Sequence, residues 1–78
     1  MYYTYILKLD NNDFYVGHTK DLKRRLQEHK TGSVFTTNNH KPINLVFFSA
    51  FLREEKARDF EKYLKSSSGF AFRNKHLI

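Results

Sequence analysis

The chain has 78 residues, with 14 Lys and Arg against eight Asp and Glu for a net charge of +6, and it contains no Cys. A chain of this length forms at most one domain, and without Cys neither disulfides nor thiolate metal ligands can stabilise it. No run approaches the roughly 18 apolar residues that span a bilayer, and the N-terminus lacks the basic start of a signal peptide, so we expect a cytoplasmic protein outside the membrane.

The charge and the aromatic content together point to nucleic acid as the partner. Eight Phe and five Tyr, with no Trp, are more rings than a small core needs, and some are expected to line a groove. A basic surface attracts polyanions, and aromatic rings stack on bases. A ribosomal protein or an ordinary basic protein would share both properties.

The first 18 residues predict a β-hairpin. Residues 1–9 are rich in aromatic and β-branched side chains, with Tyr3 and Tyr5 on one face of the expected strand. The polar segment 10–13 has turn chemistry because Asn and Asp tolerate positive φ, and 14–18 resumes a strand pattern.

The length of the hairpin loop decides whether two tyrosines share a face of the sheet. A two-residue turn at Asn11-Asn12 would place Tyr5 and Tyr15 on opposite faces, because side chains alternate along a strand. A three-residue loop or a bulge, with Asn or Asp at positive φ, would place both on one face and Gly17 opposite Tyr5 or Leu7. A site shared by the two tyrosines would require this second arrangement, in which the missing Cβ of Gly17 would leave room for a water or a phosphate.

The rest of the chain predicts a helix, a strand and a second helix. Thr19 or Asp21 can cap a helix that ends near Lys30, and 33–42 reads as a loop. The continuous apolar run 43–51 is typical of a central strand covered on both faces and is the best core candidate.

The predicted first helix carries polar side chains within its apolar stripe. Leu22, Arg25, Leu26 and His29 recur at the spacing of one buried face. Either Arg25 and His29 lie at the border of the stripe and reach water, or a guanidinium lies at the floor of a cleft.

The second helix begins near residue 53, is ended by the Ser-rich segment 66–69, and carries a carboxylate in its stripe. Glu61 falls between apolar residues at helical spacing, and an unpaired buried carboxylate costs several kcal/mol. It either pairs with a basic side chain such as Arg25 or faces a cleft and binds a divalent cation. The tail 70–78 predicts a short helix or an irregular end.

These residues together resemble the GIY-YIG endonuclease superfamily. Tyr3-Thr4-Tyr5 and Tyr15-Val16-Gly17 resemble its paired signature, although Gly and Ile are replaced in the first motif. Arg25 and His29 match its Arg-x-x-x-His helix, and Glu61 matches its metal-binding glutamate. The resemblance covers essentially the whole chain, so we expect a single nuclease domain over residues 1–78 of a small stand-alone type.

The resemblance implies both a fold and a reaction. The fold is α+β, a three-stranded antiparallel sheet flanked by helices in the order ββαβα with a possible short C-terminal helix. The reaction is hydrolysis of a DNA phosphodiester with one Mg²⁺ or Mn²⁺. Glu61 would be the sole protein ligand of the metal, Arg25 would stabilise charge on the phosphate, and Tyr5, Tyr15 or His29 would take the proton of the attacking water.

The remaining polar residues do not identify which nucleic acid is the substrate. Nine side chains are available to contact nucleic acid: Lys20, Lys23, Arg24, Lys30, His40, Lys41, Arg73, Asn74 and Lys75. Of these, Asn74 also resembles a polar residue near the C-terminus of many family members. No base-reading element is visible, so selectivity would come from branched or flapped DNA or from a partner protein, in repair or recombination, and RNA stays open. The alternatives are a non-catalytic nucleic-acid-binding module on the same scaffold and a basic RNA-associated structural protein.

Overall fold

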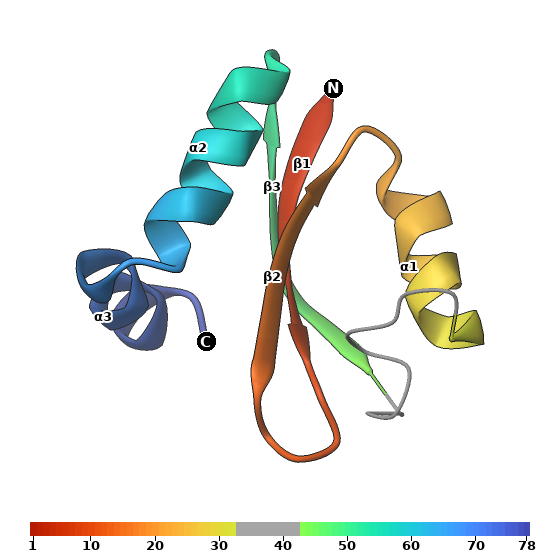
Figure 1. The fold of residues 1–78 in the computed structure, drawn as a ribbon, viewed down its shortest axis with the longest axis horizontal. Helices are drawn as coiled ribbons and strands as arrows, with labels where there is room; N and C mark the ends of the chain where they lie inside the picture. The colour runs from red at the N-terminus through yellow and green to blue at the C-terminus, as the bar shows by residue number, and fades with distance from the viewer. Residues whose placement is uncertain (33–42) are drawn as a thin grey trace.

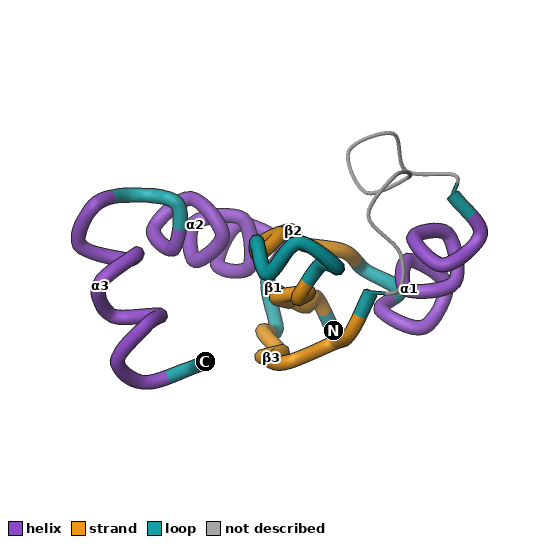
Figure 2. Tube along the Cα trace, turned by 90° about the horizontal axis from the view of Figure 1, so that it is seen from below, coloured by secondary structure: helices purple, strands orange, loops and turns teal. Residues whose placement is uncertain are grey.

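The computed structural model describes residues 1–32 and 43–78 as a three-stranded antiparallel sheet with three helices (Figure 1). The sheet order is β2-β1-β3, and α1 covers one face while α2 and α3 cover the other (Figures 1 and 2). The predicted α+β fold is confirmed, including the C-terminal helix. The elements in chain order are β1 Tyr2–Lys8, β2 Phe14–Thr19, α1 Leu22–Thr31, β3 Asn44–Phe51, α2 Glu54–Leu64 and α3 Ser67–His76.

The hairpin has the three-residue loop that places Tyr5 and Tyr15 on the same face of the sheet. The Leu9 amide donates to the Asp13 carbonyl at 2.8 Å, and Asn12 adopts a φ of 68°. As a result Tyr5 lies opposite Gly17 and Leu7 lies opposite Tyr15. The predicted pairing of Tyr5 with Gly17 is confirmed, and both tyrosines point to the α1 face of the sheet.

The two faces of β1 supply the centres of two apolar clusters. Alternate residues of the strand point to α1 and to α2, as the sequence pattern indicates. The cluster beneath α1 consists of Tyr5, Leu7, Leu9 and Ile43, with Tyr15, Leu22 and Leu26 packed against it. The cluster beneath α2 and α3 consists of Ile6, Val16 and Leu64, with Phe14, Phe47, Phe60 and Leu77 packed against it.

The apolar strand β3 lies at the edge of the sheet, so the prediction that 43–51 forms the central strand is wrong. The central strand is β1, because it pairs with both other strands. On the α2 face of β3, Phe47 and Phe51 contact Phe60, with ring centroids 6.4 and 5.7 Å apart. On the other face Phe48 is 51% exposed. An apolar run predicts a strand that buries surface, but it carries no information about the number of neighbouring strands.

Side-chain caps define the helix ends. Asp21 accepts a hydrogen bond from the Arg24 amide at 3.0 Å at the start of α1, and Gly32 ends this helix with a φ of 83°. Ser66 accepts from the Gly69 amide at 3.2 Å. The C-terminal helix therefore starts at Ser67, earlier than the expected tail at 70–78, because the Ser-rich segment caps a new helix.

None of the helices in the described part of the chain is long and apolar enough to cross a membrane.

Close packing of α3 against the end of α2 requires Gly69. A Cβ at Gly69 would collide with the main chain of Tyr63 and Leu64, which cannot move aside as a flexible side chain can. We expect Gly69→Ala to destabilise the protein by about 1 to 3 kcal/mol, the usual cost of overpacking, although Ala is the better helix former.

Urea unfolding of the Gly69→Ala and Ser68→Ala variants tests this expectation. Ser68 is the preceding residue of α3 and is exposed, so its replacement should leave the free energy of unfolding nearly unchanged. Equal or greater stability of Gly69→Ala would contradict the close approach of the two helices.

Candidate active site

Tyr5 is enclosed within the protein. It is 1% exposed, and its hydroxyl oxygen lies 3.0 Å from Nε2 of His29. A Cβ placed on Gly17 would come within 2.6 Å of the Tyr5 hydroxyl oxygen and 3.2 Å of Cε1 of Tyr15. The space above Gly17, which we expected to hold a water or a phosphate, is therefore filled by the Tyr5 phenol, and this is why a strand residue here is glycine.

His29 is fully buried between the two tyrosines, so the reading that places it at the border of its stripe is wrong. Its ring centroid lies 5.7 Å from that of Tyr5 and 5.0 Å from that of Tyr15. Burial, together with the positive charge of Arg25, lowers the pKa of His29 to about 4. The ring is neutral at pH 7. In the tautomer protonated on Nδ1, its Nε2 accepts a hydrogen bond from the Tyr5 hydroxyl.

Arg25 lies at the mouth of this cluster and keeps contact with solvent. Its guanidinium hydrogen-bonds to the Tyr5 hydroxyl and donates to Oε1 of Glu28 at 3.0 Å. These two hydrogen bonds raise the pKa of Arg25, so the guanidinium is charged at all ordinary pH values. Because 36% of the side chain is exposed, the charge is available to an anion at the surface.

The protonation of Tyr5 follows from its burial. Burial raises the pKa of Tyr5 to about 12, and the hydrogen bond from Arg25 opposes this rise without reversing it. The negative charges of Tyr15, when ionised, and of Glu61 raise it further. Tyr5 is therefore a neutral phenol at pH 7, whereas the half-buried Tyr15 keeps part of its ring in contact with solvent.

Glu61 approaches β2 from the opposite face of the sheet, on α2. Its Oε1 lies 2.5 Å from Nδ1 of His18 and its Oε2 lies 2.5 Å from Nζ of Lys65. The carboxylate of Glu61 thus pairs with His18 and Lys65, and not with Arg25, the partner suggested in one of the two alternatives above. Burial favours the protonated acid, but hydrogen bonds from Lys65 and His18 outweigh it and lower the pKa of Glu61, so the carboxylate is charged at neutral pH.

His18 is a site residue that the sequence reasoning missed. It directly follows Gly17, so on an alternating strand its side chain points to the face opposite the tyrosines, which α2 covers. That parity was available from the sequence, but the pairing with Glu61 depends on the placement of α2.

The carboxylate of Glu61 is of the kind that can hold a metal by itself. Within residues 1–32 and 43–78, no three His, Cys, Asp or Glu side chains gather closely enough to hold an ion. Mg²⁺ commonly retains several waters and binds through one or two carboxylates together with substrate phosphate oxygens. Glu61 fits this mode, since its side chain is 18% exposed and charged.

The predicted nucleic-acid contacts are spread over the molecule. Lys20, Lys23 and Arg24 lie together around the start of α1, whereas Lys30 lies at its end. Lys75 lies on α3, beyond the other face of the sheet (Figure 1). His40 and Lys41 fall outside the described residues.

Arg73 and Asn74 are engaged within the protein. The Arg73 guanidinium lies over the rings of Phe14 and Phe70, at 5.0 and 4.4 Å from their centroids, and the residue is buried. Asn74 accepts a hydrogen bond from Arg73 at 3.2 Å. Arg73 is therefore part of the packing between α3 and β2 and is not exposed to a phosphate.

Two relatives match most of the chain in sequence. The chain is 35% identical over 66 residues to UPF0213 protein CPE1444 of Clostridium perfringens, a match that covers 83% of this chain and 71% of that protein. It is 31% identical over 65 residues to UPF0213 protein YazA of Bacillus subtilis, covering 82% of this chain and 66% of that one.

A solved structure and a family model extend the comparison to nearly the full chain. The solution structure of UPF0213 protein BH0048 from Bacillus halodurans matches with a TM-score of 0.60 and 30% identity, covering 96% of this chain and 84% of that one. The family model described as the GIY-YIG catalytic domain matches residues 1–75. The chain therefore belongs to the GIY-YIG family of nuclease domains.

Proposed function

We propose that this protein is a divalent-metal-dependent endonuclease that hydrolyses phosphodiester bonds in branched, flapped or otherwise structured DNA, in repair or recombination. One observation carries the proposal. A charged Arg25 lies over a buried Tyr5 and His29 on one side of β2, while a charged Glu61 approaches the same strand from the other side. The two groups meet at neighbouring residues of β2, because the Tyr5 ring packs against Gly17 and Glu61 contacts His18.

Arg25 is the residue suited to the transition state. Attack on a phosphodiester adds negative charge to the phosphate oxygens, and a fixed guanidinium stabilises that charge without reorganising. The hydrogen bonds with Tyr5 and Glu28 hold the fork in place while part of it faces solvent. Tyr5 is in this proposal a positioning residue, because its buried hydroxyl cannot contact a water at the surface.

Tyr15 is the better candidate for receiving the proton of the attacking water. It lies beside His29 and keeps part of its ring exposed, whereas Tyr5 stays neutral and enclosed. A phenol is a weak base at neutral pH, so nearby positive charge is required to favour its ionised form.

Glu61 would hold a single Mg²⁺ or Mn²⁺ ion. When bound, such an ion supplies positive charge that polarises phosphate oxygens and acidifies water. For Oε2 to become available Lys65 must turn away, and this side chain is 54% exposed and flexible. The hydrogen bond with His18 holds Oε1 against β2.

The alternative is a non-catalytic nucleic-acid-binding module on the same scaffold, and one observation favours it. Both Glu61 oxygens are occupied by basic side chains of the protein itself. A nicking assay on a panel of branched DNAs, with and without Mg²⁺, separates the two functions. Cleavage only in the presence of Mg²⁺ supports the endonuclease, while salt-dependent binding without cleavage supports the alternative.

The carboxylate of Glu61 is the first test of the metal site. Glu61→Gln conserves volume but removes the negative charge, so we expect DNA binding to persist and Mg²⁺-dependent nicking to be lost. The control is Asp59→Asn, which removes the same charge from an exposed position of α2 and should nick normally. Wild-type nicking by Glu61→Gln would reject the metal assignment.

Arg25 is tested by separating turnover from affinity. We expect Arg25→Ala to lower the single-turnover rate by at least about a hundredfold, the scale of losing one oriented donor in the transition state. Arg58→Ala, which removes an exposed arginine of α2, should retain the rate. If Arg25→Ala changes only the apparent DNA affinity, Arg25 anchors the substrate and does not stabilise the transition state.

The buried neutral His29 predicts how stability depends on pH. Its pKa is about 4 in the folded protein against roughly 6.5 when unfolded, so the unfolded state binds more protons in this range. Folding should therefore weaken as the pH falls from 7 to 4, by about 3 kcal/mol from this group. Urea unfolding should show a shallower decline for His29→Gln, and parallel pH profiles would contradict a buried neutral His29.

A further inference from the structure

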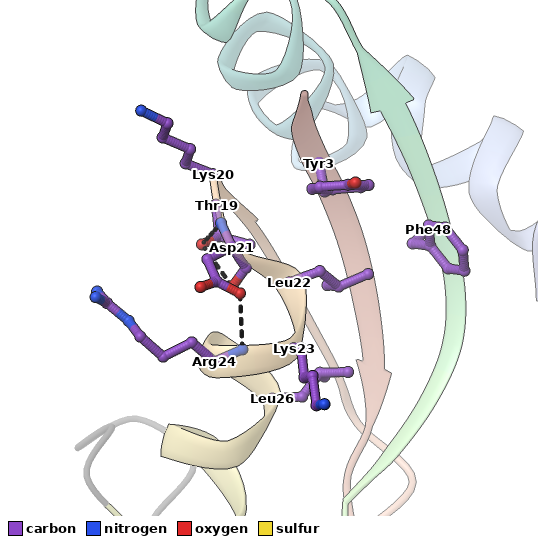
Figure 3. A pocket seen from close by; sticks show the side chains of 9 residues that line it. All are labelled: Tyr3, Thr19, Lys20, Asp21, Leu22, Lys23, Arg24, Leu26 and Phe48. Carbon is purple, nitrogen blue, oxygen red and sulfur yellow. Dashed lines mark hydrogen bonds between the residues drawn. The ribbon is translucent and has the colours of Figure 1, made fainter.

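An open groove lies beside the tyrosine cluster, on the α1 face of the sheet (Figure 3). It has a volume of about 900 Å³ and runs between the first turns of α1 and the sheet at Tyr3 of β1 and Phe48 of β3. We call it the aromatic groove; its main lining residues are Tyr3, Phe48, Thr19, Leu22, Lys23 and Leu26. None of the proposed catalytic side chains lines it.

Two aromatic rings form the sheet side of the aromatic groove. The rings of Tyr3 and Phe48 meet edge to face, with centroids 6.3 Å apart, and Phe48 is half exposed to solvent. Leu22 points from α1 toward these rings, and Leu26 lies one turn farther along the same side of the helix (Figure 3). The groove therefore offers flat apolar surface to a ligand, since a helix covers only the neighbouring part of the sheet.

Positive charge lies along the α1 side of this apolar surface. Lys23 extends from α1 on the groove side, while Lys20 and Arg24 extend from the same region to its outer side (Figure 3). The acidic side chain nearby, Asp21, is occupied as the cap of α1 by the Arg24 amide. A planar ligand that carries negative charge at its border is complementary to this arrangement.

The strand register places the aromatic groove next to the proposed catalytic cluster. Phe48 is the partner of Tyr5 across β1 and β3, and Tyr3 lies two residues before Tyr5 on the same face. Two residues of a strand span roughly 7 Å. Since phosphates of a stacked DNA strand follow one another at about 3.4 Å along the axis, a base within a few nucleotides of a phosphate at Arg25 would reach the groove.

We propose that the aromatic groove binds an unpaired base of the DNA substrate, stacked on Phe48 and bordered by Tyr3, with an adjoining phosphate at Lys23. The identity of the polymer rests on the proposed function. A paired base within a duplex has its ring faces covered by its neighbours, so only an unpaired base can stack on a protein ring. A second copy of this chain is a poorer occupant, because each copy carries a charge of +6 and would bring further lysines to Lys23.

The binding test uses a fluorescein-labelled single-stranded oligonucleotide and fluorescence anisotropy in EDTA. We expect Phe48→Ala to weaken binding about 5- to 100-fold, the range for losing one base-aromatic stack. The matched control is Phe70→Ala, which removes an equally exposed ring (53%) from α3 across the sheet and should bind like the wild type. Lys23→Gln should lower the slope of log affinity against log salt by about one, whereas Phe48→Ala should leave that slope unchanged.

Replacing nucleotides of the oligonucleotide one at a time by abasic sites identifies the stacked base. One position should weaken the wild type and leave Phe48→Ala unaffected, because the variant has already lost the stack. Equal binding by Phe48→Ala and the wild type, equal losses in both Phe variants, or tighter binding of a blunt duplex than of the single strand would overturn the proposal. So would self-association in sedimentation that Phe48→Ala abolishes without a change in DNA affinity.

The assay contains no metal, so its outcome is independent of cleavage. Loss of the proposed nuclease function would appear as absent nicking in Mg²⁺ with the stacking pattern retained. Failure of the aromatic groove would appear as normal nicking with binding indifferent to Phe48. Thermal melting of each variant confirms that the fold is intact before the comparison.

Discussion

The contact of the Tyr5 phenol with Gly17 is the constraint on which the rest of the site depends. The ring can lie across β2 only because Gly17 has no Cβ, and it meets Gly17 only because the hairpin loop has three residues. From this position the hydroxyl reaches both His29 and Arg25 on α1. A loop one residue shorter would turn the two tyrosines to opposite faces of the sheet, so they could not both contact His29.

Burial helps to determine which groups of this small site are charged. It keeps Tyr5 and His29 neutral, with their pKa values moved to about 12 and about 4, so neither carries charge near pH 7. The charged groups are those that retain contact with solvent or with counter-charges, Arg25 on one side of β2 and Glu61 on the other. A thin sheet with helices on both faces thereby brings opposite charges to one edge strand without pairing them directly.

Much of this arrangement was determined by local sequence. Given that Tyr5 and Tyr15 share a site, strand parity predicted a three-residue loop or a bulge with Asn or Asp at positive φ, because alternation along a strand and tolerance of positive φ are properties of neighbouring residues. The order of strands and helices followed for the same reason. Arg25 and Glu61 were recognised as anomalies because a charged residue within an apolar stripe needs a partner.

Other features were decided only by the tertiary structure, because they depend on which distant segments meet. The apolar run 43–51 forms an edge strand, because β1 lies between the other two strands. Only one face of this edge strand is covered by α2. Glu61 found His18 from β2, 43 residues away, instead of Arg25. His29 was enclosed and Phe48 was left exposed for one reason: α1 packs above Tyr5 on the central strand and leaves Phe48, its neighbour on the edge strand β3, partly uncovered. No local pattern encodes which strands of a sheet a helix will cover.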